Sequence, residues 1–351
     1  MTLSNKIFIH APNVHQGGGR VLLDALVHAV KGDVVLSVDE RMLLSDALKK
    51  NVQVKRVLPS ILQRFLAEKW LAQAVTKDDV VLCFGNLPPL FHLSGRTVVF
   101  VQNRYLIEDV PLKYFPLKVR LRLGVERLWL SKRLMNVDEF VVQTRTMKRF
   151  LEVLTRGKVP VRVLPFVADP SAYTRYLSPI EACNDIVFDF VYVASGEPHK
   201  NHLILIEAWC LLAEEGLYPS LCLTLDEVRF VELCCLLDGM KQRHSLKVTN
   251  VGGLSQQDVL VLYKKSGAVI YPSKFESFGL PLVEARQMGL PVLASELDYV
   301  RDVLDPEQVF DPNSPISIAR AVKRFIGASE NPLPLLDASR FIYSLFYKDI
   351  S

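Results

Sequence analysis

Motifs that identify several large enzyme classes are absent from this chain of 351 residues. It has no G-x-S-x-G, H-E-x-x-H or G-x-x-x-x-G-K-[ST] segment, which disfavours serine hydrolases, zinc peptidases and P-loop nucleotide hydrolases. It also lacks D-x-D, the usual carboxylate pair for a substrate-bound divalent metal, and its seven histidines do not cluster at metal-ligand spacing. We therefore expect no metal and no cofactor.

The cysteines and the apolar runs give no sign of a disulfide framework, a membrane span or a signal peptide. The six cysteines form no C-x-x-C pair, and most stand inside apolar runs, which is typical of reduced thiols in a cytosol. No apolar run reaches the roughly 18 residues of a membrane span. The first run stops at His10, which is too short for a signal peptide. These features predict a cytoplasmic protein.

Charge is balanced overall, with a net charge of +4 and 23% charged residues. That balance demands no nucleic-acid partner. The distribution is uneven, however, because residues 104–149 hold 11 Lys and Arg against 5 Asp and Glu.

Short apolar runs alternate with segments of helical spacing, a pattern that predicts parallel sheets covered by helices. In the first half we expect a helix at 20–30 and strands at 6–11, 33–38, 52–57, 79–84, 97–102, 139–143 and 161–165. In the second half we expect strands at 189–194, 221–225, 246–251, 268–272, 291–295 and 308–310, and helices at 200–215, 227–240, 255–266, 281–288 and 315–327.

The alternation lapses once, where Pro and Ser accumulate after Pro165. We therefore predict an N-terminal Rossmann-like domain at 1–170, a linker at 171–185 and a second Rossmann-like domain at 186–330. The last segment, 331–351, is expected to form a helix that packs back across the domains.

The segment 272–295 combines two carboxylates with a helix start. Pro281 and Gly289 bracket the expected helix, as these residues usually do. Glu276 precedes it and Glu284 lies about one turn inside it. Free N–H groups and the dipole at a helix start suit an anion, so the two carboxylates can face the ends of one elongated polar ligand. A bare E-x7-E spacing alone is as readily a loop Glu and a surface Glu.

With its flanking residues, this segment resembles the signature of retaining glycosyltransferases of family 4 nearly position by position. The resemblance is dense over 191–311 and looser before 160. It implies that Glu276 contacts the hydroxyls of a donor sugar and acts in catalysis, and that Glu284 holds the ribose. It also implies donor contacts along the intervening loop, at Ser277, Phe278, Gly279 and Leu280.

The segment 191–209 resembles the part of that family in which an Arg and a Lys clamp the diphosphate. Lys200 occupies the Lys position, whereas Ser195 stands in place of the Arg. The resemblance therefore implies that Lys200 is a catalytic residue that stabilises the leaving diphosphate, and it leaves half the clamp missing. Arg20, Lys274 and His199 are the alternatives that we consider for the lost charge.

Two glycine-containing turns complete the expected donor site. Gly17, Gly18 and Gly19 follow the first strand, and a glycine loop lets backbone amides approach a phosphate. Leu22 breaks the G-x-G-x-x-G pattern, which disfavours a dinucleotide oxidoreductase. The resemblance implies that the turn at Gly252 lies beside the nucleotide base; the alternative is an ordinary turn between a strand and a helix.

Asn103, next to Gln102, follows a strand at the edge where ligands bind in open α/β sheets, and we include it among the donor contacts. Its alternative role is that of an ordinary turn residue. Thr144 is expected to be a helix cap.

The resemblance implies two Rossmann-like domains facing each other across a cleft, the GT-B architecture. It implies transfer, with retention, from a nucleotide-diphosphate sugar to a glycan or lipid-linked acceptor in polysaccharide or lipopolysaccharide assembly. Three alternatives stay open: a nucleotide-sugar epimerase, a non-catalytic sugar-nucleotide-binding subunit, which the missing Arg favours, and a membrane-surface scaffold.

The segment 111–135 mixes seven cations with leucines, Phe115 and Trp129. One hypothesis is a helix on an anionic membrane, with its cations among the headgroups, which would make the protein peripheral. The other is an ordinary sheet-covering helix whose buried stripe comprises Leu121, Leu128, Trp129 and Leu134.

Overall fold

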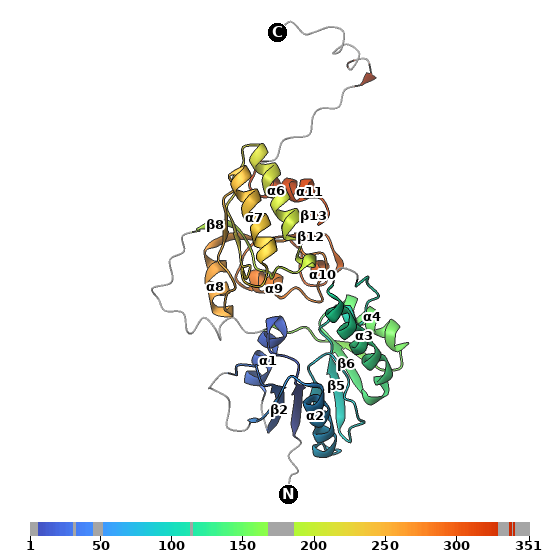
Figure 1. Ribbon diagram of the computed structural model, residues 1–351. Coiled ribbons are helices and arrows are strands. Elements are labelled where there is room, and N and C mark those ends of the chain that lie inside the picture. The colour runs from blue at the N-terminus through green and yellow to red at the C-terminus, as the bar shows by residue number, and fades with distance from the viewer. Residues whose placement is uncertain are drawn as a thin grey trace.

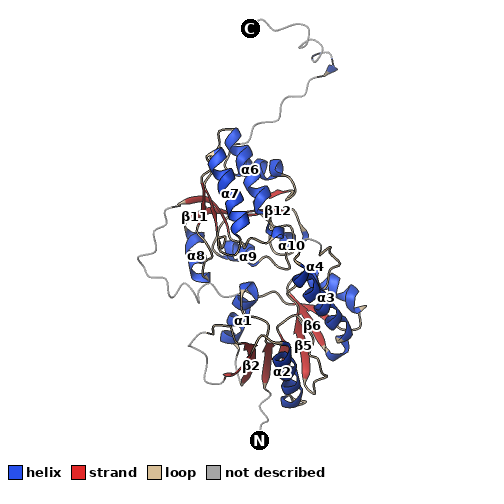
Figure 2. Cartoon of the chain, viewed as in Figure 1, coloured by secondary structure: helices blue, strands red, loops and turns tan. Residues whose placement is uncertain are grey.

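The computed structural model describes residues 6–30, 33–44, 52–112, 115–167 and 186–328, together with 337, 338 and 340. These residues form two α/β lobes, each built on one parallel sheet (Figures 1 and 2), which is the predicted fold class. The predicted linker and most of the predicted C-terminal helix lie outside the described residues.

The sheet of the first lobe has seven strands in the order β3-β2-β1-β4-β5-β6-β7. The strands are β1 (Ile7–Ala11), β2 (Val34–Asp39), β3 (Val52–Val57), β4 (Val80–Cys83), β5 (Arg96–Phe100), β6 (Glu139–Val142) and β7 (Val161–Val163). Its helices are α1 (Gly17–Ala29), α2 (Ile61–Ala74), α3 (Leu117–Lys132) and α4 (Arg145–Thr155), with the short 3-10 turns η1 (Arg104–Leu106) and η2 (Leu134–Asn136).

The sheet of the second lobe has six strands in the order β10-β9-β8-β11-β12-β13. They are β8 (Phe188–Tyr192), β9 (Leu221–Leu223), β10 (Val248–Asn250), β11 (Ser266–Tyr271), β12 (Val292–Ser295) and β13 (Gln308–Phe310). The accompanying helices are η4 (Pro198–Lys200), α6 (His202–Glu214), α7 (Val231–His244), α8 (Gln256–Lys264), α9 (Leu280–Gln287), α10 (Asp298–Arg301) and α11 (Pro315–Phe325).

Burial on both faces explains why the central strands are apolar runs rather than alternating ones. All six residues of β2 are buried, as are the last four of β11. In the second lobe one continuous core surrounds Trp209, whose indole ring packs edge-on against Phe190 and donates to the main-chain oxygen of Pro219. The strands of a parallel sheet all end at the same edge, and in both lobes the loops at this edge line a cavity.

The predicted strands all form, with ends that differ by up to two residues. The predicted glycine loop is wrong, because Gly17–Gly19 form the first turn of α1. Gly17 has a φ of +65°, which glycine adopts without strain. The three glycines therefore open a helix whose first turn carries no side-chain cap, instead of forming a separate loop before it.

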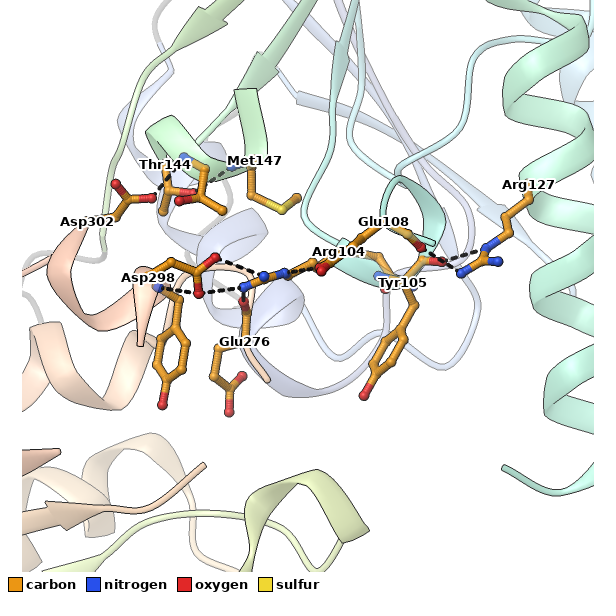
Figure 3. Close-up of polar contacts among 12 residues, drawn as sticks. Arg104, Tyr105, Glu108, Arg127, Thr144, Met147, Glu276, Asp298 and Asp302 are labelled. Carbon is orange, nitrogen blue, oxygen red and sulfur yellow. Dashed lines mark hydrogen bonds and ion pairs between the residues drawn. The ribbon is translucent and has the colours of Figure 1, made fainter. Parts of the chain in front are cut away.

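Arg104, at the start of η1, joins the two lobes (Figure 3). Its guanidinium donates to both carboxylate oxygens of Asp298 at 3.1 and 2.8 Å and to the main-chain oxygen of Glu276 at 3.2 Å. Glu108 accepts from the remaining Nε–H of the same side chain. The guanidinium also lies 4.7 Å from the ring centre of Phe275. One buried cation thus binds an acid of each lobe, Glu108 and Asp298.

Two more contacts reinforce this junction. The predicted cap Thr144 is confirmed, since its hydroxyl accepts from the Met147 amide at 3.2 Å. In the same turn, Asp302 of the second lobe accepts from the Thr146 amide at 2.8 Å (Figure 3). A second-lobe side chain, Leu280, packs against the core of the first lobe.

We expect Arg104→Gln to loosen the junction. Charge-assisted hydrogen bonds contribute about 1.5–3 kcal/mol each, so the equilibrium should shift towards separated lobes. Small-angle scattering should show a larger radius of gyration than for the parent. Arg286→Gln is the matched control, because Arg286 pairs with Glu307 inside the second lobe. Scattering of Arg104→Gln that matches the parent's would contradict the prediction.

Candidate active site

A cavity of about 850 Å³ lies between the lobes, at the carboxyl edges of both sheets. Ligands bind at such edges in open α/β folds. Its walls include the start of α1 from the first lobe and, from the second, the loops after β8, β9 and β11. We call this space the larger cavity.

The start of α9 is shaped by one glycine and one proline. Gly279 caps the helix with a φ of +74°, in the left-handed region, and Pro281 lies in the first turn, so the predicted helix start is confirmed. A Cβ at residue 279 would stand 3.1 Å from Leu282 and 3.4 Å from Tyr299, which leaves little room for another side chain. No side chain caps the helix. Pro281 has no N–H and the Leu282 amide donates to the main-chain oxygen of Gly279 at 2.9 Å, so the Leu280 amide and the helix dipole are what this end offers to an anion.

Glu276 sits in a ring of donors that converge on one oxygen. Its Oε1 accepts from Lys200 Nζ at 2.5 Å, from Ser273 Oγ at 2.7 Å and from the Tyr271 hydroxyl at 3.0 Å. The side chains of Lys200 and Glu276 are only 15% and 14% exposed. The two predicted catalytic residues are therefore an ion pair, fixed in orientation by two hydroxyl groups.

Residues 181–334 match the family model of glycosyl transferases, group 1. The matched segment contains the second lobe, including Lys200, Glu276 and Glu284.

Curated relatives share part of this segment. The serotype-specific mannosyltransferase WbdA of Escherichia coli is 30% identical over 146 residues, which are 40% of this chain and 17% of that protein. The O-antigen chain mannosyltransferase B of the same species is 33% identical over 128 residues, 35% of this chain and 32% of the relative. The aligned regions thus span a third or less of these relatives.

Solved structures match both lobes. A Rickettsia africae glycosyltransferase superposes with a TM-score of 0.66 at 15% identity, covering 93% of this chain and 89% of its own. Anabaena HepE, solved with UDP and glucose, gives 0.65 at 14% identity and covers 92% and 90%. The two-lobed architecture is therefore the GT-B fold, as expected from the sequence.

Glu284 lies at another part of the larger cavity, inside α9. Its Oε1 accepts from Gln256 Nε2 at 2.7 Å, and Gln256 belongs to the first turn of α8. Burial raises the pKa of the Glu284 carboxyl, and the bond from Gln256 opposes that rise in part. The carboxylate of Glu284 is thus poorly solvated and has one hydrogen-bond donor, Gln256, in a fixed position.

The start of α1 faces the start of α9 across the larger cavity. Gly18 and Leu280 are so close that a Cβ at residue 18 would stand 2.7 Å from Leu280 Cδ1. Two helix starts without side-chain caps therefore meet at one place, and their amides and dipoles favour negative charge there.

A smaller cavity of about 290 Å³ adjoins the larger one. Both are lined by Gly19, Gln102, Glu276 and Ser277. The walls of the smaller cavity are rich in side-chain amides and aromatic rings, contributed by Asn13, Gln16, Asn86, Asn103, Tyr105 and Phe275. These groups can hydrogen-bond and stack without adding charge.

Most of the predicted site residues line the larger cavity, namely Gly17, Gly18, Gly19, Lys200, Glu276, Ser277, Phe278, Gly279, Leu280 and Glu284. Two lie elsewhere. Gly252 does not line it, although Gly253 does. Asn103 lines the smaller cavity, and its side-chain oxygen accepts from the Tyr105 amide at 3.0 Å, so it also serves as the turn residue that we considered.

Sequence reasoning missed several wall residues. Thr224, Asp226, Arg229 and Phe230 follow β9 and line the larger cavity. Their signal was available, because the carboxyl ends of all strands in a parallel sheet meet at the same edge. Gln256 and Tyr271 were missed because each acts by donating a hydrogen bond to a carboxylate, Glu284 and Glu276 respectively. Their positions in the sequence do not reveal these partners.

We expect Lys200→Met to destabilise the fold, because Glu276 would keep its charge in a poorly solvated place with two hydroxyl donors only. The loss should be about 1–3 kcal/mol, measured as a lower urea midpoint. Lys274→Met, an exposed change in the loop that carries Glu276, should have no such effect. Adding Glu276→Gln to Lys200→Met should recover part of the lost stability. If the stability changes of the two single variants simply add in the double variant, Lys200 and Glu276 do not interact.

Proposed function

We propose that the protein is a retaining glycosyltransferase that moves a hexosyl group from a nucleotide-diphosphate sugar to a saccharide acceptor. The observation that carries the proposal is the convergence of the Lys200–Glu276 pair, the two helix starts and Glu284 on one cavity, within a segment that matches group 1 glycosyl transferases. Cations and backbone amides take the part that a metal ion has in other transferases.

The donor fits the larger cavity as an elongated anion. Glu284 accepts bonds from the ribose hydroxyls, the starts of α1 and α9 receive the diphosphate, and Glu276 meets the sugar. This order follows the positions of the two carboxylates on either side of the α9 start. It agrees with the roles that the family 4 signature implies.

Breaking the bond from the anomeric carbon to the diphosphate oxygen builds negative charge on the leaving group. Lys200 and the amides at the two helix starts are preorganised to stabilise that charge in a confined space. The acceptor oxygen attacks from the same face as the leaving diphosphate departs, which retains configuration. The departing diphosphate is the base that takes the acceptor's proton.

Mannose is the first donor sugar to test, because the curated relatives are mannosyltransferases of O-antigen chains. The acceptor belongs in the smaller cavity, where amides and aromatic rings suit a neutral saccharide. A glycan or lipid-linked saccharide of cell-surface polysaccharide or lipopolysaccharide assembly meets this description.

A transfer assay tests the proposal. The purified chain is incubated with UDP- and GDP-linked hexoses, mannose included, and with mannose-containing oligosaccharides. Release of nucleoside diphosphate that depends on both donor and acceptor is the expected result, and Glu276→Gln should abolish it. Nucleotide binding with neither hydrolysis nor transfer would favour a non-catalytic subunit.

We expect Glu284→Gln to weaken binding of the preferred nucleoside diphosphate about tenfold, because a charge-assisted bond is lost. Since burial raises the pKa of Glu284, its carboxylate protonates at a higher pH than an exposed Glu would. Parent affinity should therefore fall as the pH is lowered from 8 towards the range in which an ordinary Glu carboxyl titrates.

The ligand phosphate also takes up a proton as the pH is lowered, with a pKa of about 6, and it does so equally with either protein. Calorimetry of both the parent and Glu284→Gln therefore separates protonation of Glu284 from protonation of the ligand. The variant should show the shallower pH dependence. Glu214→Gln, an exposed change at the end of α6, is the control. Identical pH profiles for parent and Glu284→Gln would contradict the assignment.

Helix α3 supports the membrane hypothesis (Figure 1). Leu117, Leu121, Val125 and Leu128 are 58–66% exposed, and their spacing sets them on one helix face. The expectation that Leu121 and Leu128 are buried is wrong, because the helix packs on the core through Leu123 and Leu130 instead. Trp129 and Leu134 do pack there in part.

The cations of α3 divide into two groups. Lys118, Arg120, Arg122 and Lys132 are exposed, whereas Arg127 donates to the main-chain oxygens of Tyr105 and Glu108 at 2.8 Å. No helix in the described part of the chain is long and apolar enough to cross a bilayer. We therefore propose that α3 lies on an anionic membrane and brings the acceptor side of the cavity near lipid-linked saccharides.

We expect the parent to sediment with vesicles in proportion to their anionic lipid content and less so at high salt. Each cation near such a surface contributes about 1 kcal/mol, so changing Lys118, Arg120 and Arg122 to Gln should reduce binding strongly. Leu121→Ser with Val125→Ser should also reduce it. Ile316→Ser, an exposed apolar change on α11, should not. Equal sedimentation with neutral and anionic vesicles at low salt would reject the membrane role.

A further inference from the structure

The turn after β9 is rigidly built and faces the larger cavity. Asp226 Oδ1 accepts from the amides of Val228 and Arg229, both at 3.0 Å, and the Asp226 main-chain oxygen accepts from the Phe230 amide at 3.0 Å. The turn therefore presents Arg229 and Phe230 side by side at the cavity wall.

Phe230 brings this turn against the loop after β8. A Cβ at Gly196 would stand 2.5 Å from Phe230 Cγ, so the ring fits only because residue 196 has no side chain. The Arg229 guanidinium lies 5.0 Å from the centre of the same ring, within the range of a cation–π contact. Arg229 is thereby held beside Ser195, where the family 4 pattern has its missing Arg.

Arg229 is paired with Glu197, but weakly. Its Nη2 lies 3.1 Å from Glu197 Oε1, and the two side chains are 56% and 27% exposed. Glu197 also accepts from the Ser195 hydroxyl. An ion pair this exposed contributes little to stability, so a diphosphate can replace the carboxylate.

The other candidates for the lost charge fit less well. His199 lines the smaller cavity, and burial together with Lys200 lowers its pKa, which keeps the ring neutral. Lys274 is exposed and lines neither cavity. Among the described residues, the cations that do line the larger cavity are Arg20, Lys200 and Arg229. Of these, Arg229 belongs to the turn that packs on the Ser195–Gly196 loop.

We propose that Arg229 binds the donor diphosphate in place of the Arg that Ser195 replaces, and that Glu197 holds Arg229 until the diphosphate displaces it. A guanidinium can donate two parallel bonds to phosphate oxygens. The inference rests on the proposed function, since it requires a diphosphate ligand. It adds a binding residue from the turn after β9.

Calorimetry with the preferred nucleoside among ADP, GDP and UDP, and with its monophosphate, tests the inference. Arg229→Gln should weaken diphosphate binding at least about tenfold and monophosphate binding much less. Arg229→Lys should recover part of the loss, and Arg243→Gln, an exposed change at the end of α7, is the control. Glu197→Gln should bind the diphosphate more tightly than the parent, because Arg229 loses its competing partner.

The outcomes separate the two proposals. A parent that binds no nucleoside diphosphate would overturn both. A parent that binds it while Arg229→Gln binds equally well would overturn the inference alone. If Arg229→Gln fails to fold, Glu197→Gln still decides, since unchanged or weaker diphosphate binding by that variant contradicts displacement of the carboxylate.

Discussion

The loop that carries Glu276 is held by cations from both lobes, and the arrangement of the cavity follows from that constraint. Arg104 of the first lobe donates to the main-chain oxygen of Glu276, while Lys200 of the second pairs with its carboxylate. Because Arg104 also binds Asp298, the position of Glu276 is coupled to the angle between the lobes. A change in that angle would move the carboxylate relative to the start of α1.

The polar contacts between the lobes carry this coupling. Apolar contacts alone would not fix the orientation of one lobe relative to the other. The bidentate hydrogen bonds from Arg104 to Asp298 and the hydrogen bond from the Thr146 amide to Asp302 each require one geometry. Such bonds can also be remade after opening, since water solvates both partners when the lobes part. A cavity enclosed by two lobes needs that reversibility for a ligand to enter and leave.

The strands and the start of α9 could be predicted because their causes are local. Apolar runs define strands, and Gly279 with Pro281 defines a helix start, whatever the rest of the chain does. The roles of Arg104 and Arg229 could not, because each depends on a partner brought near by folding: Asp298 is 194 residues from Arg104, and Arg229 is held by a ring that packs on Gly196. The glycines at 17–19 were predicted as a loop because a glycine run usually ends helices. The close approach of Leu280, which leaves no room for a Cβ at residue 18, depends on the second lobe and is not visible in the sequence.

Two of the cations that line the larger cavity are paired before any ligand arrives. Lys200 pairs with Glu276 and Arg229 pairs with Glu197. The first pair is largely buried, where an unpaired Lys200 would be costly; the second is exposed and more easily exchanged. A diphosphate that enters therefore gains little from simple attraction; it must exchange partners with the carboxylates. Exchange favours a ligand with several closely spaced anionic oxygens over a single-charge anion, since only the former can engage both cations at once. Selectivity for a diphosphate would then arise from the carboxylates as much as from the cations that contact it.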